Sequence, residues 1–520
     1  MSAPQPIPAS LSHSSALASL AREFDLSDGD IEDAPDKIAG QVKKLAELWQ
    51  SAGATSEMVE RSMRRIARSH SVPLPGKASI AERLNRMTDP AWWRRSFRKR
   101  FRVVEQHEIA RGAVHFHASA YVSPKALRRH QRNTRRLAEL LASLEVLNLD
   151  TGETFPLDDL IATSQANPAM RRMAMMSRIR GVETHAKAKG HEAYFLTITA
   201  PSRMHARFEK SGVANPRFDG SSPRQVQTYL NGVWRKAMRS LLRQGVEAYG
   251  LRTVEPHHDA CPHWHVLVFT PPEHAQALHD TVRTHALADS PDEPGADIRR
   301  FTCKLMTSGG AAAYAAKYVA KGIDGHGVAD DTESNNDGAT AATSVVAWAR
   351  LWGIRQFQFF GLPAITPTKE LYRHDGEGLG SPALGELHEK VKAKDYAGYL
   401  DVLEARAIAL RVRYRERPSS RYAGEIARAI DGLHAGAADL HAPIEITTRT
   451  ETWCIQPRPA TRDDGAFEFT WTRFNNCARP MKSMAYDGPA RTCRGPVPRF
   501  AIEGRRRRTP STGRTAAAAV

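Results

Sequence analysis

The segment YGLRTVEPHHDACPHWHVLVFT (residues 249–270) decides the fold of this chain. Its two ends, YGLRTVEP (249–256) and HWHVLVFT (263–270), are both β-prone, and the short polar stretch between them suits the loop of an antiparallel hairpin. Successive side chains of a strand point to opposite faces. We therefore expect His263 and His265 to share one face, while Trp264 points the other way, into a core.

Two imidazoles on one strand face can hold a metal ion, but such a site needs a third ligand. Glu255 ends the preceding strand, and in the predicted hairpin it can sit beside the histidine pair. His257, His258 and Asp259 compete for this role from the loop. A surface strand with two exposed histidines is the alternative interpretation.

A second triplet shows how weak the His-x-His pattern is alone. His115-Phe116-His117 also places an apolar residue between two histidines, but no strand that ends in an acid precedes it in the same way. We interpret this second triplet as structural.

The neighbouring segments alternate between strand-like and helix-like patterns. We expect strands at AYFLTITA (193–200) and 297–306, and helices at 221–245, 271–287 and 309–322. Ser221 or Ser222 can cap the first helix, and Gly322 can end the last. These elements predict an α+β domain with a central antiparallel sheet flanked by helices.

Two tyrosines lie one turn apart on the last of these helices. Tyr314 and Tyr318 share a face at spacing i, i+4, and Lys317 and Lys321 form a similar pair on a neighbouring face. A tyrosine pair that packs a core is the plain interpretation, yet the surrounding alanines leave both hydroxyls room to meet a substrate. A tyrosine oxygen can attack a phosphodiester. Nearby lysines can stabilise the charge that develops.

The composition favours a polyanionic partner. The 520 residues carry a formal net charge of +17, as expected for a protein that binds nucleic acid. Five cysteines without a CxxC pair argue against a disulfide scaffold or zinc finger and favour a reducing cytoplasm. No apolar run is long enough to span a membrane, and no secretory signal is indicated.

The remaining regions are less informative. PLPGKAS (73–79) is not a P-loop, so we expect no nucleotide cofactor. We expect residues 325–344 to form a polar loop or insertion, and Arg505, Arg506, Arg507 and Arg508 to bind DNA. We divide the chain into a disordered N-terminus (1–36), a helical basic region (37–160), the α+β domain (161–370), a helical region (371–440) and a basic C-terminal region with a disordered tail (441–520).

Together, the ordered motifs resemble the bacteriophage replication gene A protein family of the HUH endonuclease superfamily. The matching motifs are FLTIT (195–199), EPHHDACPHWHVLVF (255–269) and YAAKYVAK (314–321). Further similar stretches are DPAWWRR (89–95), ANPAMRR (166–172), AWARLWGIRQFQFFG (347–361) and WTRFNNC (471–477).

The resemblance implies a nuclease domain with a ferredoxin-like or RRM-like sheet at 161–370. It implies that His263 and His265 bind a divalent metal, Mg²⁺ or Mn²⁺, with Glu255 at the position of the third ligand. Tyr314 and Tyr318 would be alternating nucleophiles. The implied enzyme nicks single-stranded DNA at an origin and stays on the 5′ end as a phosphotyrosine. It leaves a 3′-OH for a host polymerase, relies on a host helicase, and later rejoins the displaced strand as a circle.

Three other classes of protein remain open at this point. A two-tyrosine transposase or a conjugative relaxase would share the site. A non-catalytic DNA-binding regulator would not need intact histidines and tyrosines. A zinc hydrolase would use the histidines but would need neither Tyr314 nor Tyr318.

Overall fold

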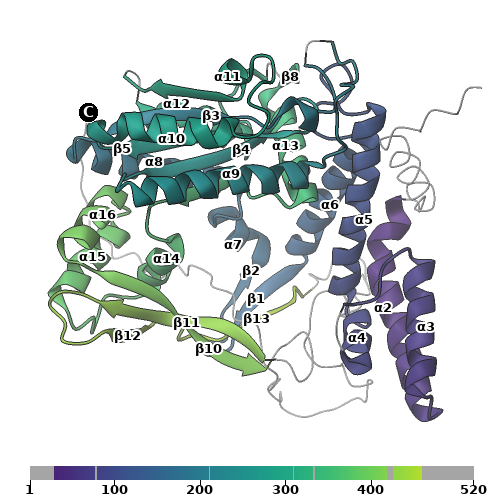
Figure 1. The fold of residues 1–520 in the computed structure, drawn as a ribbon. Helices are drawn as coiled ribbons and strands as arrows, with labels where there is room; N and C mark the ends of the chain where they lie inside the picture. The colour runs from purple at the N-terminus through teal and green to yellow at the C-terminus, as the bar shows by residue number, and fades with distance from the viewer. Residues whose placement is uncertain are drawn as a thin grey trace, which may run out of the picture.

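A five-stranded antiparallel sheet forms the middle of the protein (Figure 1). The computed structural model describes residues 28–76, 79–209, 211–307, 310–331, 334–418 and 426–459. The strand order is β6 (Phe301–Leu305), β3 (Glu192–Ile198), β5 (Pro262–Thr270), β4 (Tyr249–Pro256) and β9 (Phe357–Phe360). The predicted hairpin is confirmed, because β4 and β5 pair antiparallel with Glu255 opposite His263.

Helices cover both faces of this sheet (Figure 1). The side chains of Trp264, Val266 and Val268 pack on one face against α9 (Pro223–Arg243) and α10 (Ala275–Leu287). Leu267 and Phe269 pack on the other face, in the core that contains α8 (Pro168–Ala188) and α12 (Ala311–Lys321). The period-two alternation of β5 thus divides its residues between two cores. Ser222 caps α9 in a capping box with Gln225, and Gly322 ends α12.

The N-terminal region is mostly helical. It consists of α2 (Asp28–Ser51), α3 (Ser56–Ser69), α4 (Ile80–Met87), α5 (Pro90–Arg111), α6 (Pro124–Ala142) and α7 (Leu157–Thr163). Trp93 and Phe97 of α5 lie in a small separate core that includes residues of α2, α3 and α4. The expected disorder of residues 1–36 is wrong from Asp28 onward. Asp36, later in this helix, accepts a hydrogen bond from Arg94 of α5.

The helical prediction for residues 37–160 also fails at its end. Residues of β1 (Leu144–Asn148) pair with β2 (Thr154–Pro156) and with β13 (Trp453–Pro457), which follows some three hundred residues later. Only the folded chain brings these strands together, so the local sequence pattern could not show the pairing.

Two sequence-based predictions about the C-terminal half need correction. Residues 371–440 begin as helices α14 (Ile365–Arg373), α15 (Pro382–Lys392) and α16 (Tyr396–Ala405), but β10 (Ala409–Pro418), β11 (Ile426–Gly436) and β12 (Ile444–Thr447) then form a sheet. Leu433, Ala435 and Ile446 are its buried residues, and their alternation is typical of strands rather than helices.

The polar segment 325–344 is only partly a loop. It contains β7 (Asp330–Asp331) and β8 (Asn336–Asp337), and from Gly338 it belongs to α13 (Gly338–Trp352), which Asp337 caps. The short elements η1 (Ser202–Met204), η2 (Pro272–His274) and α11 (Ala296–Arg299) complete the fold. Arg505–Arg508 lie outside the described residues. In the part of the chain that is described, no helix is long and apolar enough to cross a membrane.

Candidate active site

The structure brings the three predicted metal ligands together on the α12 side of the sheet. His263 lies opposite Glu255 in the β4–β5 register, and Nε2 of His263 lies 2.9 Å from Nε2 of His265. One ligand atom from each of the three side chains lies within 4.8 Å of the other two. Two strands therefore supply a compact set of two nitrogens and one carboxylate, as the hairpin predicted.

Burial keeps both imidazoles neutral. It lowers the pKa of His263 well below its ordinary value, and neighbouring histidines lower it further. Burial, with Lys321 and Lys317, lowers the pKa of His265 to about 3. Neutral imidazoles offer lone pairs, which is the form that binds metals. Burial also raises the pKa of Glu255 to about 7, against the opposing effect of Lys321.

Two potential ligand side chains of this set each have a buried polar atom without a hydrogen bond to any described residue. Thr197 Oγ1 lies 3.2 Å from Nδ1 of His265, so this contact holds the ring with Nε2 directed at His263. Oε1 of Glu255 and Nδ1 of His263 are buried, and neither has a hydrogen-bond partner among the residues described. An unsatisfied buried carboxylate oxygen is costly. A divalent ion bound by Glu255, His263 and His265 would remove that cost.

The loop competitors of Glu255 have other contacts. The ring of His257 stacks on His263, with centroids 3.9 Å apart, rather than joining the three ligand atoms. Asp259 accepts hydrogen bonds from the backbone N–H groups of Ala206 (2.9 Å) and Cys261 (3.1 Å). Asp259 therefore holds the loop, whereas Glu255 has a ligand atom within 4.8 Å of those of His263 and His265.

The tyrosines of α12 lie beside this set. The ring of Tyr318 is 4.1 Å from that of His265, centroid to centroid, and its hydroxyl donates to the hydroxyl of Tyr314 over 3.5 Å. Phe195 packs against both tyrosines and stacks on His265. Tyr314 is 42% exposed. Both hydroxyls are thus placed at one spot, and one tyrosine is open to a substrate.

The two lysines of the same helix have different environments. Lys317 is exposed, with its Nζ 5.9 Å from the centre of the Tyr318 ring. Lys321 is buried, and its Nζ lies 3.5 Å from Oε2 of Glu255 and 2.9 Å from Oδ1 of Asp331. Lys321 is thus held by two carboxylates inside the protein, whereas Lys317 faces the solvent.

Sequence reasoning missed the partners of Lys321. Asp331 also accepts hydrogen bonds from the hydroxyls of Tyr121 and Ser334. Asp331 belongs to a segment whose polar composition indicated a surface loop, and Tyr121 lies far away in the sequence. No local signal marks either residue as part of the site.

Helix α12 is held at its first turn as well. Gly310 precedes the helix and has no side chain to cap it. The carboxylate of Glu183, on α8, accepts hydrogen bonds from the N–H groups of Ala311 and Ala312, both over 3.1 Å. A carboxylate at this position satisfies two free donors and interacts favourably with the helix dipole.

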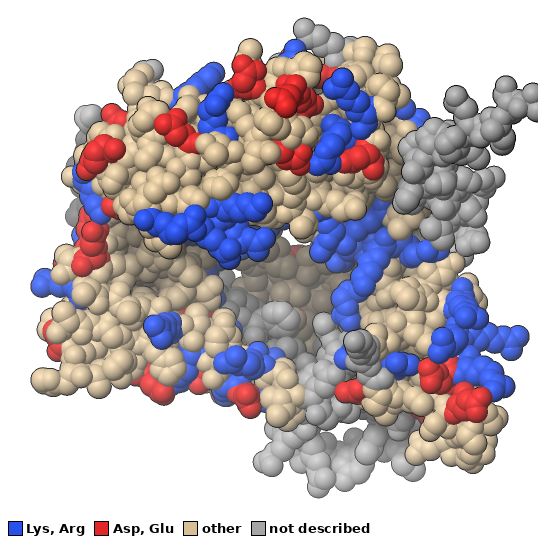
Figure 2. Space-filling view, in the orientation of Figure 1, with Lys and Arg blue, Asp and Glu red and all other residues tan. Residues whose placement is uncertain are grey.

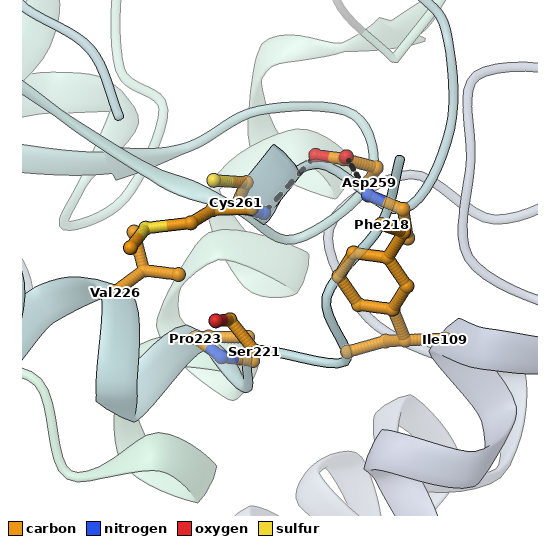
Figure 3. A pocket seen from close by; sticks show the side chains of 9 residues that line it. Ile109, Phe218, Ser221, Pro223, Val226, Asp259 and Cys261 are labelled. Carbon is orange, nitrogen blue, oxygen red and sulfur yellow. Dashed lines mark hydrogen bonds between the residues drawn. The ribbon is translucent and has the colours of Figure 1, made fainter. Parts of the chain in front are cut away.

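A small pocket lies apart from this site, and the side chains that line it are mainly apolar (Figure 3). Ile109, Phe218 and Val226 line it, together with Cys261 and Asp259. His205, Asp259 and Cys261 form a second group with metal-like spacing. Asp259 of this group accepts the two hydrogen bonds from backbone N–H groups that are dashed in Figure 3, so its carboxylate holds the loop.

The triplet His115-Phe116-His117 provides an internal comparison. Nδ1 of His115 accepts a hydrogen bond from the backbone N–H of His117 over 3.2 Å. Within the described ranges, neither histidine joins a group of three potential ligands. The structural interpretation of this triplet remains a prediction.

Several phage and prophage replication proteins are similar to this chain in sequence. The sequence model of the family described as bacteriophage replication gene A protein (GPA) matches residues 15–326. The replication protein of Haemophilus phage HP1 is 35% identical over 439 residues, which cover 77% of this chain and 54% of that protein. The replication gene A protein of Escherichia phage P2 is 32% identical, with coverages of 72% and 51%.

A prophage relative extends this comparison. A protein of Salmonella typhimurium named "probable replication endonuclease from prophage-like region" is 30% identical over 491 residues, 86% of this chain and 60% of that protein. The chain thus spans between about half and three fifths of the length of these relatives. No solved structure matches the chain significantly.

Proposed function

This chain belongs to the bacteriophage replication gene A protein family, and from that premise we propose that it initiates rolling-circle replication by nicking and rejoining single-stranded DNA at an origin. The relatives are named as replication proteins, and some as replication endonucleases. One observation carries the chemical proposal. Tyr318 packs on His265, which forms a compact group with the buried side chains of Glu255 and His263.

The ligand set fits a divalent metal, Mg²⁺ or Mn²⁺. Carboxylate oxygen suits both ions, and imidazole nitrogen suits Mn²⁺ better. The 2.9 Å between the two Nε2 atoms is the spacing expected of neighbouring ligands with bonds of about 2.1 Å. When bound, the ion would polarise the scissile phosphate and stabilise the charge added during attack.

The residues of α12 would perform the transfer. The Oη of one tyrosine attacks the phosphorus, a bond from Oη to phosphorus forms, and the bond from phosphorus to O3′ breaks. The tyrosine loses its proton, and the released O3′ gains one, so the products are a 5′-phosphotyrosine and a 3′-OH. One phosphodiester bond replaces another, so the strand can later be rejoined without an external energy source. The ammonium of Lys317, exposed beside the Tyr318 ring, would interact with the phosphate oxygens.

The second tyrosine would make the second cut, which ends a round of replication. After synthesis from the 3′-OH, it would cleave the regenerated origin, while the first tyrosine still holds the old 5′ end. The newly released 3′-OH then attacks the first phosphotyrosine, which closes the displaced strand into a circle. The hydroxyls of Tyr314 and Tyr318 lie 3.5 Å apart, so both transfers could take place at the metal held by Glu255, His263 and His265. A host helicase and a host polymerase would supply unwinding and synthesis.

The test is formation of a covalent adduct. The protein is incubated with Mg²⁺ or Mn²⁺ and single-stranded oligonucleotides tiled across its own replicon, and the products are separated under denaturing conditions. We expect one oligonucleotide to give an adduct that is lost in the double variant Tyr314→Phe/Tyr318→Phe.

The double variant Tyr372→Phe/Tyr414→Phe is the matched control, because it removes two hydroxyls elsewhere in the chain, and it should keep the adduct. Absence of an adduct with every oligonucleotide would overturn the proposal. Release of a cleaved product without any adduct would instead favour a hydrolase.

A further inference from the structure

Helix α9 presents a line of positive charge to the solvent. Its 21 residues contain five basic side chains and no Asp or Glu. The five are Arg224, Arg235, Lys236, Arg239 and Arg243, and all are exposed. Arg235, Arg239 and Arg243 follow each other at intervals of four residues, so they lie along one face. At 1.5 Å per residue they span about 12 Å of helix.

These charges lack acidic partners. No ion pair joins any of the five to a carboxylate in the described ranges of the chain. Arg224 donates to the backbone oxygen of Trp352, and Arg243 donates to the hydroxyl of Ser240. An uncompensated row of like charges opposes folding. It becomes favourable when the surface meets a polyanion.

The positive charges of α9 lower the pKa values of neighbouring basic groups. The pKa of His285, on α10, is lowered by burial and by Lys236 and Arg243. The pKa of Arg102, on α5, is lowered by burial and by Arg224 and Arg98. The positive surface thus continues from α9 to α5. Figure 2 shows Lys and Arg side chains gathered along the edge of α9 and along the region of α5 and α6, on either side of a hollow.

This surface lies on the opposite side of the sheet from the candidate active site. α9 packs on the face that carries Trp264 and Val266. His263 and His265 alternate with these residues, and His265 faces Tyr318 of α12. A strand that reached the tyrosines and a nucleic acid that bound α9 would therefore be separate segments.

The side-chain types favour double-stranded DNA on α9. Single strands are held largely by stacking of bases on aromatic side chains. None of the exposed residues of α9 is aromatic, whereas Phe195, Tyr314 and Tyr318 meet at the active site. Arginine and lysine contact phosphates without reading the bases, so they can bind a duplex whose bases stay paired.

We infer that the exposed face of α9 binds the phosphate backbone of duplex DNA beside the nick site. This inference rests on the proposed function. The DNA substrate would contact both faces of the sheet. The single strand to be cut reaches the tyrosines, and the paired flank is held by Arg235, Lys236 and Arg239.

Duplex affinity tests the inference without cleavage. Fluorescence anisotropy is measured with a mixed-sequence duplex oligonucleotide and, separately, a single strand, in EDTA. For the triple variant Arg235→Gln/Lys236→Gln/Arg239→Gln we expect duplex affinity to fall at least about tenfold. The slope of log K against log salt should fall by about two to three, because three phosphate contacts are lost. Single-strand affinity should change much less.

The matched control removes three exposed arginines of α3, in the variant Arg61→Gln/Arg65→Gln/Arg68→Gln. Both variants lose the same charge, so a general effect of net charge would weaken duplex binding equally in both and would overturn the inference. An equal loss of single-strand affinity in the α9 variant would overturn the assignment to duplex.

The tyrosine adduct on a short single strand serves as the separate readout. It should form at the same rate in the α9 variant as in the unaltered protein. If no adduct forms in the unaltered protein, the proposed function fails, while the duplex measurement still decides the role of α9.

Discussion

The ammonium group of Lys321 lies 3.5 Å from Oε2 of Glu255 and 2.9 Å from Oδ1 of Asp331, and all three side chains are buried. Lys321 is on α12, three residues after Tyr318, and Glu255 is on β4. This contact joins the helix that carries the tyrosines to the strand that carries the third candidate ligand. A change at Lys321 should therefore affect both stability and metal binding.

We predict that Lys321→Met lowers the free energy of unfolding by about 3–5 kcal/mol, because it leaves two buried carboxyl groups without their cation. Urea denaturation in EDTA measures this loss. Mn²⁺ affinity, measured by calorimetry, should fall as well, because Glu255 without Lys321 holds its proton more tightly. The exposed Lys317→Met should change stability by less than about 0.5 kcal/mol. Equal effects of the two substitutions would contradict the prediction.

The metal-free protein should lose stability as the pH rises through the titration of Glu255. Burial raises the pKa of this carboxyl from 4.5 to about 7, so the folded state binds the proton more tightly than the unfolded state. The stabilising contribution is complete below about pH 4.5 and is lost as the pH passes 7. A shift of this size corresponds to about 3 kcal/mol.

Glu255→Gln removes this dependence because it cannot ionise. Denaturation curves are measured in EDTA between pH 4.5 and 8. As the pH rises, the free energy of unfolding of the unaltered protein should fall relative to that of Glu255→Gln. The exposed Glu273→Gln should follow the unaltered protein. If the free energy of unfolding changes with pH in the same way in both proteins, the pKa of Glu255 is not raised in the metal-free protein, and the prediction is wrong.

The two His-x-His triplets should differ in metal binding. His263→Ala/His265→Ala should lower Mn²⁺ affinity more than about 100-fold, beyond the effect of changes outside the ligand set. The same double substitution at His115 and His117 should leave the affinity unchanged, because among the described residues neither histidine joins a group of three potential ligands. Calorimetry with Mn²⁺ measures both, and a loss of binding in the His115/His117 variant would place the metal elsewhere.

The tyrosines should contribute unequally to the first cut. Tyr318 packs on His265 at 4.1 Å between ring centres, whereas Tyr314 contacts Tyr318 and Phe195. We expect Tyr318→Phe to slow the first nick about tenfold or more, a cost of at least 1.4 kcal/mol in the barrier, and Tyr314→Phe to leave it nearly unchanged. Single-turnover adduct formation on one oligonucleotide compares them. The reverse order of rates would assign the first cut to Tyr314.

The sequence was sufficient wherever a local pattern determines the structure. The alternation in β5 separated His263 and His265 from Trp264, and the length of the connecting loop placed Glu255 opposite His263. The helical spacing of Tyr314 and Tyr318 put both on one face of α12. These features depend on residues within a few positions of each other, where strand and helix periods are decisive.

Other features depend on contacts between distant segments. No pattern near Lys321 marked its partner Asp331, which lies in a polar stretch, or Tyr121, whose hydroxyl donates to Asp331. β1 pairs with β13, which no periodicity near Leu144 could show. Tertiary pairing overrides local propensity at such positions.

The attachment of α12 at both ends limits how the tyrosines can exchange roles. Glu183 binds the backbone of its first turn, and Lys321 binds Glu255 from its last. A backbone fixed in this way cannot rotate to offer one phenol and then the other. The change must come from rotation about the side-chain bonds, which takes picoseconds to nanoseconds for exposed groups. The timing of the two cuts would then be set by the arrival of DNA, and the protein itself would need no slow conformational step between them.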